Sequence, residues 1–367
     1  MGRSFDIGID EIGPQKTVQL FFPVSNLHAI VVIDNTALGP SIGGVRVSPD
    51  VNVEEVKRLA RVMTMKNSIA GLAHGGGKAG IIADSKDPDK EHYFRLFAQA
   101  IKELYEYIPG PDMGSDEECM AWIYDEIGRA TGLPEELGGL PLDRLGATGY
   151  GLAECAEVAC PYAGVELKGA RVVIQGFGSV GKAAALNLSE RGAIIIATSD
   201  TKGCIYNPDG LDIKELIYTK EETGSVINYK MGTVKGCDEL FTIPCDILIP
   251  AATPDVIHGG NVERIDTRLL IQGANIPVTR EAEEILHKRG ILTIPDFIAN
   301  AGGVIMAAME YSKRTERESF DAISERIRKN TRLILEKAVN EKCLPRDAAE
   351  SIAKERIIKA MSYKKGL

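Results

Sequence analysis

The sequence predicts an α/β protein with two domains. Its 367 residues are too many for a single compact core, so two domains are expected, each large enough to fold alone. Strand-like runs and amphipathic helices fill the first third of the chain, and a glycine-punctuated strand, turn, helix and strand opens the second half. Between them, residues 132–151 are rich in glycine and proline, as expected of a crossing between domains.

Composition limits the class of partner. With 43 Lys and Arg against 52 Asp and Glu, the net charge of −9 argues against nucleic acid or an anionic membrane as partner. No apolar run approaches the roughly 20 residues of a membrane span, and the start MGRSFDIGIDEIG lacks the apolar core of a signal peptide, so we expect the cytoplasm. Seven cysteines without a CxxC pair or a histidine cluster predict neither disulfides nor a metal site.

The first domain begins with strand-like sequence from Thr17 to Val47. The runs VQLFFPV and HAIVVI predict an antiparallel start to a sheet. The next piece, GPSIGGVRV, follows Ile42 with Gly43 and Gly44, which we interpret as a turn stripped of side chains.

Residues 53–70 form a predicted helix, for which Asn52 is the expected N-cap. Apolar residues recur at three- and four-residue spacing, at Val56, Leu59, Ala60, Met63 and Ala70. Lys66 falls on this stripe. Its ammonium must then find an anion or a cavity, because burying an unpaired ammonium is costly, unless it snorkels to water along its stem.

A glycine-rich turn is predicted directly after this helix, at Gly75 to Gly77, followed by Lys78. The missing side chains let backbone or ligand approach closely and place the Lys78 ammonium in a crowded pocket. Desolvation there would lower the pKa of Lys78 toward neutrality, where an amine can act as a base. A phosphate-binding loop does not fit the spacing, because Leu72 stands where it needs glycine and Ala79 where it needs Ser or Thr.

An aspartate in a stiff loop is the next candidate. A strand at residues 79–83 and a helix at about 90–107 lead to the sequence IPGPDMGS, in which prolines and glycines, Gly110 among them, surround Asp112. Ser115 and Glu118 form a predicted capping box that begins another helix. Asp112 is therefore either an extra cap at a helix N-terminus or a functional carboxylate.

The second domain opens with a dinucleotide-binding fingerprint. ARVVIQGFGSVGKAAALNLSE predicts a strand, the glycines Gly176, Gly178 and Gly181, and a helix, and a second strand ends at Asp200, 24 positions after the first glycine. The glycines allow a pyrophosphate to approach the helix N-terminus, and Asp200 would accept hydrogen bonds from the ribose. Further strands at 246–252, 269–275 and 292–296 predict that one sheet edge also carries three more groups, Ala251, Asn275 and Asn300.

The end of the chain, residues 318–365, is predicted to be helical. Its candidate inward positions are Phe320, Ile323, Ile327, Leu333, Leu335, Ile352, Ile357 and Met361.

These motifs resemble the glutamate, leucine, phenylalanine and valine dehydrogenases over nearly the whole chain. The matching pieces are GGxR at 43–46, MKN and HGGGKAG around Lys66 and Lys78, PDMG, ATGYG, GFGSVG, PAA, GANIPVT and PDFIANAGGV. The resemblance implies an N-terminal α/β domain with a mixed sheet, a Rossmann-type dinucleotide-binding domain, and an active site in the cleft between them. It implies reversible oxidative deamination of an L-amino acid to a 2-oxo acid and ammonia.

The resemblance also implies residue roles. Lys66 would hold the substrate carboxylate, Lys78 would activate water, and Asp112 would carry the proton of the amine. The substrate would also meet Gly44, Ile42, Gly110, Asn300, Val304 and Ala307. The cofactor would meet Thr148, Gly176, Gly178, Ser179, Val180, Gly181, Asp200, Ala251, Ala252, Asn275 and Asn300.

Domain limits and assembly follow from the same resemblance. Residues 1–137 would bind substrate and form a homo-oligomer, with the helix at about 343–367 packed back on them, and residues 138–342 would bind the dinucleotide.

The substrate is expected to be apolar, of the leucine, valine or phenylalanine type. Glutamate dehydrogenases typically place a lysine where this chain has Ile42, and a serine where it has Ala307. Without these partners a buried side-chain carboxylate would cost several kcal/mol. Gly110 and Ala307 leave volume for a branched or aromatic side chain. Glutamate dehydrogenase activity is the alternative, since a cation from elsewhere in the fold could meet the carboxylate.

The cofactor is expected to be NAD or NADP. Asp200 favours NAD because a carboxylate repels a 2′-phosphate, but Lys202, Ser199 and Thr201 could contact one. A catalytically inactive nucleotide-binding regulatory protein is the alternative of another class, although it would have no reason to keep Lys66, Lys78 and Asp112 together. A hydroxy-acid dehydrogenase would need a catalytic His or Arg, and neither His258 nor His287 has a suggestive partner.

Overall fold

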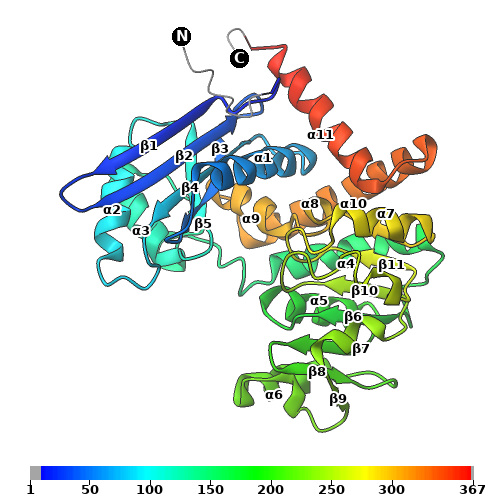
Figure 1. Ribbon diagram of the computed structural model, residues 1–367. Helices are drawn as coiled ribbons and strands as arrows, with labels where there is room; N and C mark the ends of the chain where they lie inside the picture. Colours follow the sequence, from blue (N-terminus) through cyan, green and yellow to red (C-terminus); the bar gives the residue numbers. More distant parts are fainter. Residues whose placement is uncertain (1–9, 365–367) are drawn as a thin grey trace. The chain divides into compact units, whose positions relative to one another are not determined.

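The computed structural model describes residues 10–364 (Figure 1). Its backbone contacts divide the chain into two compact units. The first unit comprises Met1–Pro141, Val304–Ser319 and Glu350–Leu367, and the second comprises Leu142–Gly303 and Phe320–Ala349. Each unit is built around one sheet.

The first sheet has five strands in the order β1-β2-β4-β3-β5. They are β1 (Lys16–Phe22), β2 (Leu27–Asn35), β3 (Ser41–Val47), β4 (Gly75–Ile82) and β5 (Tyr107–Pro111). β2 is antiparallel to β1 and to β4, whereas β3 is parallel to β4 and to β5. The predicted mixed sheet and its antiparallel start are therefore confirmed.

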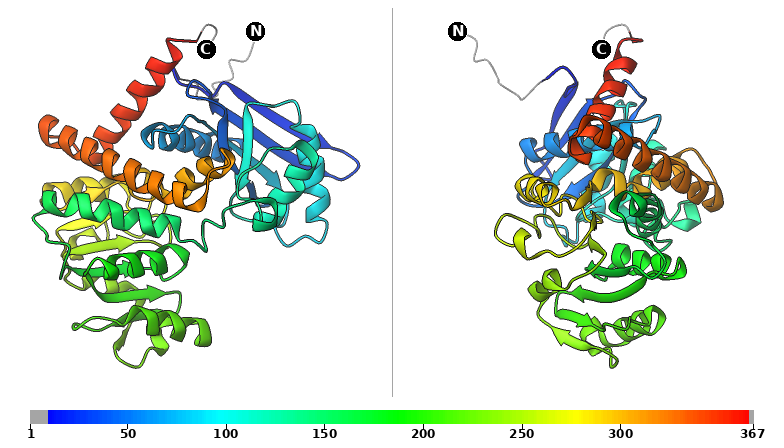
Figure 2. Two further views of the ribbon diagram at one scale, coloured as in Figure 1. Left: turned by 180° about the vertical axis from the view of Figure 1, so that it is seen from behind. Right: turned by 90° about the vertical axis from the view of Figure 1, so that its right-hand side faces the viewer.

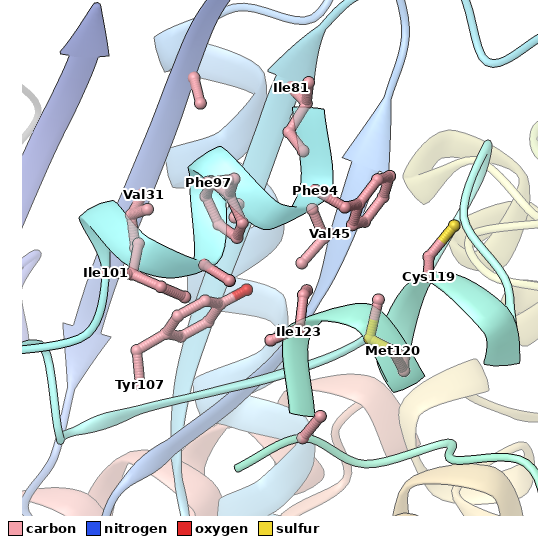
Figure 3. Close-up of a cluster of buried hydrophobic side chains, with 14 of the residues drawn as sticks. Val31, Val45, Ile81, Phe94, Phe97, Ile101, Tyr107, Cys119, Met120 and Ile123 are labelled. Atoms are coloured by element: carbon pink, nitrogen blue, oxygen red, sulfur yellow. The ribbon is translucent and has the colours of Figure 1, made fainter. Parts of the chain in front are cut away.

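Helices cover both faces of this sheet. They are α1 (Val53–Ile69), α2 (Lys90–Ala100) and α3 (Glu117–Ile127). Because side chains alternate along a strand, Val31 and Val45 join a core with Phe94 and Phe97 of α2 (Figure 3). The opposite face packs on α1 through a smaller cluster of Ile30, Val32, Val51, Val56 and Ala60.

The second sheet has seven strands in the order β12-β11-β10-β6-β7-β8-β9. They are β6 (Arg171–Gln175), β7 (Ile194–Asp200), β8 (Gly203–Tyr206), β9 (Thr233–Lys235), β10 (Ile247–Pro250), β11 (Leu269–Ile271) and β12 (Leu292–Ile294). Those from β12 to β7 are parallel, and β8 and β9 add an antiparallel edge. This is the predicted Rossmann-type arrangement.

The helices of this half of the chain are α4 (Ala147–Ala159), α5 (Ser179–Glu190), α6 (Ile213–Thr223), α7 (Arg280–Lys288), α8 (Asp296–Ala299) and α10 (Glu316–Glu341). α10 lies along α4 (Figure 2), where Arg328 donates to the buried Glu154 at 3.1 Å and Ser324 donates to it at 2.8 Å. The remaining helices are α9 (Gly302–Tyr311) and α11 (Pro345–Met361).

Two predicted turns are wrong, because both glycine runs are strands. Gly43 and Gly44 lie in β3, and Gly75 to Gly77 open β4. The physical reason is close packing: a Cβ on Gly43 would stand 1.7 Å from the carbonyl oxygen of Gly77, and one on Gly76 would stand 2.0 Å from the Thr64 nitrogen on α1. The absence of a side chain at Gly43 lets β3 pack closely on β4, and its absence at Gly76 lets α1 pack closely on β4.

Three local predictions also need correction. The helix predicted at 90–107 ends at Ala100, because Tyr107 starts β5. Asp116, not Ser115, caps α3 by accepting from the Cys119 nitrogen. Leu333, predicted to face inward, is 42% exposed, because the register of α10 buries Ile334 instead.

The predicted cap at the start of α1 is confirmed. Asn52 caps α1 by accepting from the Glu55 nitrogen at 3.1 Å. All seven cysteines are free thiols. Within residues 10–364, no group of His, Cys, Asp and Glu is suited to a metal ion, and no helix has the length and apolar character needed to cross a membrane.

Candidate active site

The first unit gathers charged side chains on the α1 face of its sheet. Lys78 of β4 is buried, and its ammonium lies 3.0 Å from Oδ2 of Asp112, directly after β5. Arg46 of β3 approaches the same oxygen with Nε at 3.0 Å and also pairs with Glu55 of α1. The parallel pairing of β3 with β4 and β5 thus brings together the two residues predicted to be catalytic.

Gly44 provides the space in which Lys78 and Asp112 meet. A Cβ at this position would stand 2.7 Å from Cβ of Asp112 and 3.2 Å from the Lys78 ammonium. It would also meet the carbonyl oxygen of Pro111 at 2.6 Å. Any side chain here would therefore displace the charged pair.

Burial and neighbouring charges shift the pKa values of both members of the pair downward. Burial lowers the pKa of the Lys78 ammonium, and Arg46 adds to the lowering, while Asp112 opposes it. Burial opposes ionisation of Asp112, but the Lys78 and Arg46 cations outweigh it and hold the pKa of that carboxyl below its usual value. Lys78 is thereby moved toward the neutral form of a base.

Lys66 lies on α1 and is buried, with 8% of its surface exposed, so it does not snorkel to water. Its neighbour Asn67 fixes the helix on β4 by donating to the carbonyl oxygen of Gly75 at 2.6 Å. The helix stripe predicted from the spacing thus places a second lysine over the same sheet face as Lys78.

Small and apolar groups flank the charged residues. Ile42 is buried. A Cβ on Gly110 would meet the hydroxyl of Thr131 at 2.9 Å. Thr131 was missed from the sequence, since a threonine in a glycine-rich segment carries no periodic signal. It is 1% exposed and is held by its nitrogen, which donates to Pro109.

Val304 and Ala307 lie on one face of α9 and are partly exposed. Glu310, on the same helix, is buried and accepts from the nitrogens of Leu133 and Leu140, both at 3.1 Å. Burial raises the pKa of the Glu310 carboxyl, although these nitrogens oppose the shift. Glu310 thus ties α9 to the segment that follows Thr131.

The second unit holds a cavity of about 790 Å³ at the carboxyl ends of β6, β7 and β10. Of the residues predicted for the cofactor, it is lined by Gly176, Gly178, Ser179, Val180, Asp200, Ala251 and Ala252. Gly176 has φ of +93°. A Cβ on Gly181 would stand 1.9 Å from the carbonyl oxygen of Gly176, so this glycine allows α5 to pack tightly on the turn.

The α5 N-terminus is open toward this cavity. Gly178 is the N-cap and supplies no capping side chain, and a Cβ there would meet nothing within 4 Å. Unpaired helix N–H groups and empty space suit a pyrophosphate. The residues present therefore fit a dinucleotide.

Asp200 is held by several protein donors. Its carboxylate accepts from the nitrogens of Lys202 at 2.9 Å and Val226 at 2.8 Å, and from the Ser225 hydroxyl at 3.0 Å. The Lys220 ammonium lies 3.5 Å away. Burial opposes ionisation, but these donors and Lys220 hold the pKa of Asp200 below its usual value. Exposed Cys237 also lines the cavity and donates to the Asp200 carbonyl oxygen.

Asn275 and Asn300 contact each other and, like Thr148, are not among the residues that line that cavity. Asn300 donates to Oδ1 of Asn275 at 3.0 Å and to the carbonyl oxygen of Ala274 at 3.1 Å. Its own Oδ1 is buried and has no partner among the described residues, which leaves an acceptor for a ligand. The Thr148 hydroxyl lies next to Gly303, 3.2 Å from where a Cβ would stand.

A partly buried arginine supports the pair of Asn275 and Asn300. Arg346, in the first turn of α11, donates to Glu283 at 2.7 and 2.8 Å and to Asp296 at 3.1 Å. Asp296 in turn accepts from the Ile276 nitrogen at 3.0 Å. The segments that carry Asn275 and Asn300 are thereby fixed by one network.

Two family models together match most of the chain. Residues 138–365 match Glutamate/Leucine/Phenylalanine/Valine dehydrogenase, and residues 14–129 match Glu/Leu/Phe/Val dehydrogenase, dimerisation domain.

Similar proteins include three glutamate dehydrogenases. The glutamate dehydrogenase of Aeropyrum pernix is 40% identical over 355 residues, covering 90% of this chain and 85% of its own. The NADP-specific glutamate dehydrogenase of Saccharolobus shibatae is 42% identical, covering 76% and 69%. The catabolic NAD-specific glutamate dehydrogenase of Bacillus subtilis is 37% identical, covering 83% and 76%.

Two solved structures are similar over almost the whole chain. The hetero-hexameric glutamate dehydrogenase of Thermus thermophilus, in its Leu-bound form, has a TM-score of 0.85 and 28% identity, covering 96% of this chain and 91% of its own. The L-tryptophan dehydrogenase of Nostoc punctiforme has a TM-score of 0.76 and 25% identity, covering 96% and 98%.

Proposed function

The chain belongs to the glutamate/leucine/phenylalanine/valine dehydrogenase family, and from this premise we propose that it oxidatively deaminates an L-amino acid with an apolar side chain. The reaction is reversible and NAD(P)-dependent, and yields a 2-oxo acid and ammonia. The observation that carries the proposal is the buried Lys78 ammonium 3.0 Å from Asp112 on a glycine-lined sheet face.

Each charged residue has a role in this reaction. Lys66 holds the substrate carboxylate. Once the substrate has become an iminium, neutral Lys78 takes a proton from the water that attacks it. Asp112 then carries the proton to the amine that leaves as ammonia. The dinucleotide, held at the α5 N-terminus, supplies the hydride acceptor when bound.

The residues around the pair support an apolar side chain. Ile42 is buried, and Gly44 and Gly110 lie beside each other in the register of β3 and β5. The nearby guanidinium groups are engaged: Arg46 by Asp112 and Glu55, and Arg129 by the carbonyl oxygens of Tyr107, Ile101 and Leu104. A side-chain carboxylate would compete for them at a cost.

Glutamate is the second candidate substrate. It is favoured by the names of the relatives that are about two-fifths identical to this chain, and the Thr131 hydroxyl beside Gly110 could donate to a carboxylate. The name of the L-tryptophan dehydrogenase supports the apolar class on the same fold.

The test is the initial rate of NADH and NADPH formation with leucine, valine, phenylalanine, tryptophan and glutamate. Leucine or an aromatic amino acid should give the highest kcat/KM. The Ile42→Lys variant places an ammonium before Gly43 and should shift kcat/KM toward glutamate. A wild-type preference for glutamate would contradict the apolar class. If no amino acid of the panel is oxidised but the protein still binds NADH, a regulatory nucleotide-binding role would be favoured.

For the cofactor we propose acceptance of both dinucleotides with a preference for NAD. The charge of Asp200 supports NAD, whereas its engagement by Ser225, Val226 and Lys220 weakens repulsion of a 2′-phosphate. The ratio of kcat/KM for the two cofactors tests this. A ratio that favours NADP would contradict the preference.

We further propose a cytoplasmic homo-oligomer. Residues 1–137, with 343–367, would bind substrate and assemble, and residues 138–342 would bind cofactor. Edge strand β1, with Phe21 60% exposed, supports assembly through the first sheet. Light scattering coupled to size-exclusion chromatography measures the oligomer, and a monomer at micromolar concentration would contradict it.

A further inference from the structure

Two cations share a single carboxylate oxygen beside the proposed base. Oδ2 of Asp112 lies 3.0 Å from the Lys78 ammonium and 3.0 Å from Nε of Arg46. In the described part of the chain, no side chain bonds to the other oxygen, Oδ1. Arg46 also reaches Glu55 through Nη1, so both ends of its guanidinium are fixed.

This arrangement bears on a difficulty in using Lys78 as a base. A base must be neutral to take a proton, but a carboxylate at 3.0 Å favours the charged ammonium. Arg46 remains charged at any working pH, and it directs this charge at the same oxygen. It therefore offsets the field of Asp112 at Lys78.

The other charged groups around Lys78 do not replace this effect. On α1, Glu55 favours the charged ammonium, and buried Lys66 is itself a cation. On β2, Asp34 is taken up by Arg61 at 2.8 Å and by the Thr64 hydroxyl at 2.6 Å. Arg46 is thus the permanent cation bonded to the carboxylate that holds Lys78.

We propose that Arg46 is a positioning residue of the active site: it fixes Oδ2 of Asp112, prevents that carboxylate from holding Lys78 in its charged form, and leaves Oδ1 for the substrate amine. The inference rests on the proposed function, in which Lys78 is the base. Arg46 itself touches neither substrate nor cofactor in this role.

The shape of the side chain matters as well as its charge. The guanidinium binds Asp112 through Nε and Glu55 through Nη1, which a single lysine ammonium cannot reproduce in the same geometry. A lysine at position 46 should therefore preserve part of the effect, and a neutral side chain should preserve none.

The experiment is the pH dependence of kcat/KM for oxidation of the best amino acid of the panel. Arg46→Met and Arg46→Gln remove the charge, and Arg46→Gln keeps a hydrogen-bond donor. Arg46→Lys keeps a charge. Arg95→Met is the matched control, because Arg95 pairs with Glu91, Asp125 and Glu126 on the exposed surface of α2 and α3.

With the guanidinium removed, the pKa values of Lys78 and Asp112 should both rise, because Arg46 lowers each of them. The acidic limb of the profile should move to higher pH by about one unit in both neutral variants. At a pH below the limb this shift lowers kcat/KM roughly tenfold, and at alkaline pH it lowers kcat/KM less. Arg46→Lys should shift less, and Arg95→Met should not shift.

A double variant tests whether the orphaned Glu55 causes the shift. In Arg46→Met/Glu55→Gln the upward shift should persist, because Asp112 still faces Lys78 alone. Its disappearance would overturn the assignment to Asp112.

Two further results would overturn the inference. One is an equal loss of rate at every pH with an unmoved limb, which is what a purely structural role gives. The other is a shift in Arg46→Lys as large as in Arg46→Gln. If Arg46→Met does not fold, the comparison of the acidic limb between Arg46→Gln and Arg46→Lys tests the inference. A wild-type protein inactive on the whole panel would instead refute the proposed function.

Discussion

Lys78 lies in β4, a strand that is half glycine, and its side chain is buried on the sheet face that packs on α1. The pKa of Lys78 is lowered by this burial. Activity in the direction of amino acid oxidation should accordingly fall as the pH drops and Lys78 takes up a proton.

Replacing the proposed base tests the role of this residue. Lys78→Met should reduce kcat for amino acid oxidation by roughly 100-fold or more, the usual contribution of a positioned base. NADH binding, followed by cofactor fluorescence, should be unchanged. Lys354→Met, which removes an exposed partner of Glu11, is the control and should retain full activity. A Lys78→Met enzyme within threefold of wild type would exclude Lys78 as the base.

Gly44 offers a test of geometry without a change of charge. Gly44→Ala should lower kcat/KM by roughly 100-fold, because its Cβ would meet Asp112 at 2.7 Å and the Lys78 ammonium at 3.2 Å. The comparison of kcat/KM with the denaturant midpoint separates site displacement from unfolding. Wild-type kinetics in this variant would show that activity does not depend on the present positions of Lys78 and Asp112.

At this scale the sequence predicted some residues and not others. Lys66, Lys78 and Asp112 were identified because charged residues on an apolar stripe or among glycines are unusual. Arg46 entered the sequence analysis only as part of the GGxR motif, and Thr131 was not predicted, since the contacts of both depend on how the strands pair. The contacts of Arg46 follow from the pairing of β3 with β4 and β5, and those of Thr131 from its hydrogen bond to β5.

At the scale of elements, α1 was predicted closely, because its apolar spacing and its N-cap Asn52 are both visible in the sequence. The sequence predicts turns at the glycine runs of β3 and β4, since local preference cannot reveal that a strand has helix α1 directly against it. α3 begins one residue later than its predicted capping box, because the Ser115 hydroxyl donates to Val45 and accepts from the nitrogen of Asp112.

The first turn of α11 should have a large effect on stability. Arg346→Met leaves the buried carboxylates of Glu283 and Asp296 without their guanidinium, which should cost about 3–5 kcal/mol in the free energy of unfolding.

Arg280→Met is the matched control for that change. Arg280 is half exposed and pairs with Asp347 and Glu284, so its loss should cost under about 1 kcal/mol. Urea unfolding measures both variants. Equal losses in the two would contradict the view that the Arg346 network is buried and essential.

At the scale of the whole molecule, both units should lose stability in acid. Asp10 and Asp112 in the first unit, and Glu154 and Asp200 in the second, have pKa values held below normal, mainly by cations or N–H donors that outweigh burial. The unfolded chain therefore binds more protons than the folded one. The free energy of unfolding should be highest above the unfolded pKa values and decline as the pH falls through the folded ones.

For Asp10 the decline spans from the usual carboxyl pKa of 3.8 down to its folded-state pKa of about 2. Glu154→Gln should be less stable than wild type at pH 7, since it loses the charge that meets Arg191 and Arg328. The difference should shrink below about pH 4. Urea midpoints from pH 3 to 7 measure it, and a difference independent of pH would show that Glu154 acts through shape alone.

The two-unit architecture and its sheets were predictable because length, a glycine fingerprint and a glycine- and proline-rich crossing are properties of the chain itself. The substrate class was harder to predict from the sequence, because it depends on which side chains face Lys78 rather than on any linear pattern. Ile42 and Ala307 are single positions, and the effect of each on substrate choice depends on the side chains that surround it.

The distribution of the thiols makes the enzyme suited to selective labelling. Burial raises the pKa of Cys155, Cys160, Cys204 and Cys245 to about 12 and that of Cys119 to about 11, which leaves these thiols poorly reactive toward alkylating dyes. Burial also raises the pKa of Cys343, which is partly exposed, so Cys343→Ser is the control for labelling at Cys237. Cys237 is exposed and stands at the rim of the dinucleotide cavity beside Asp200. The chain thus carries a natural attachment point for a fluorophore, whose emission would report cofactor arrival and departure during turnover without any engineered cysteine.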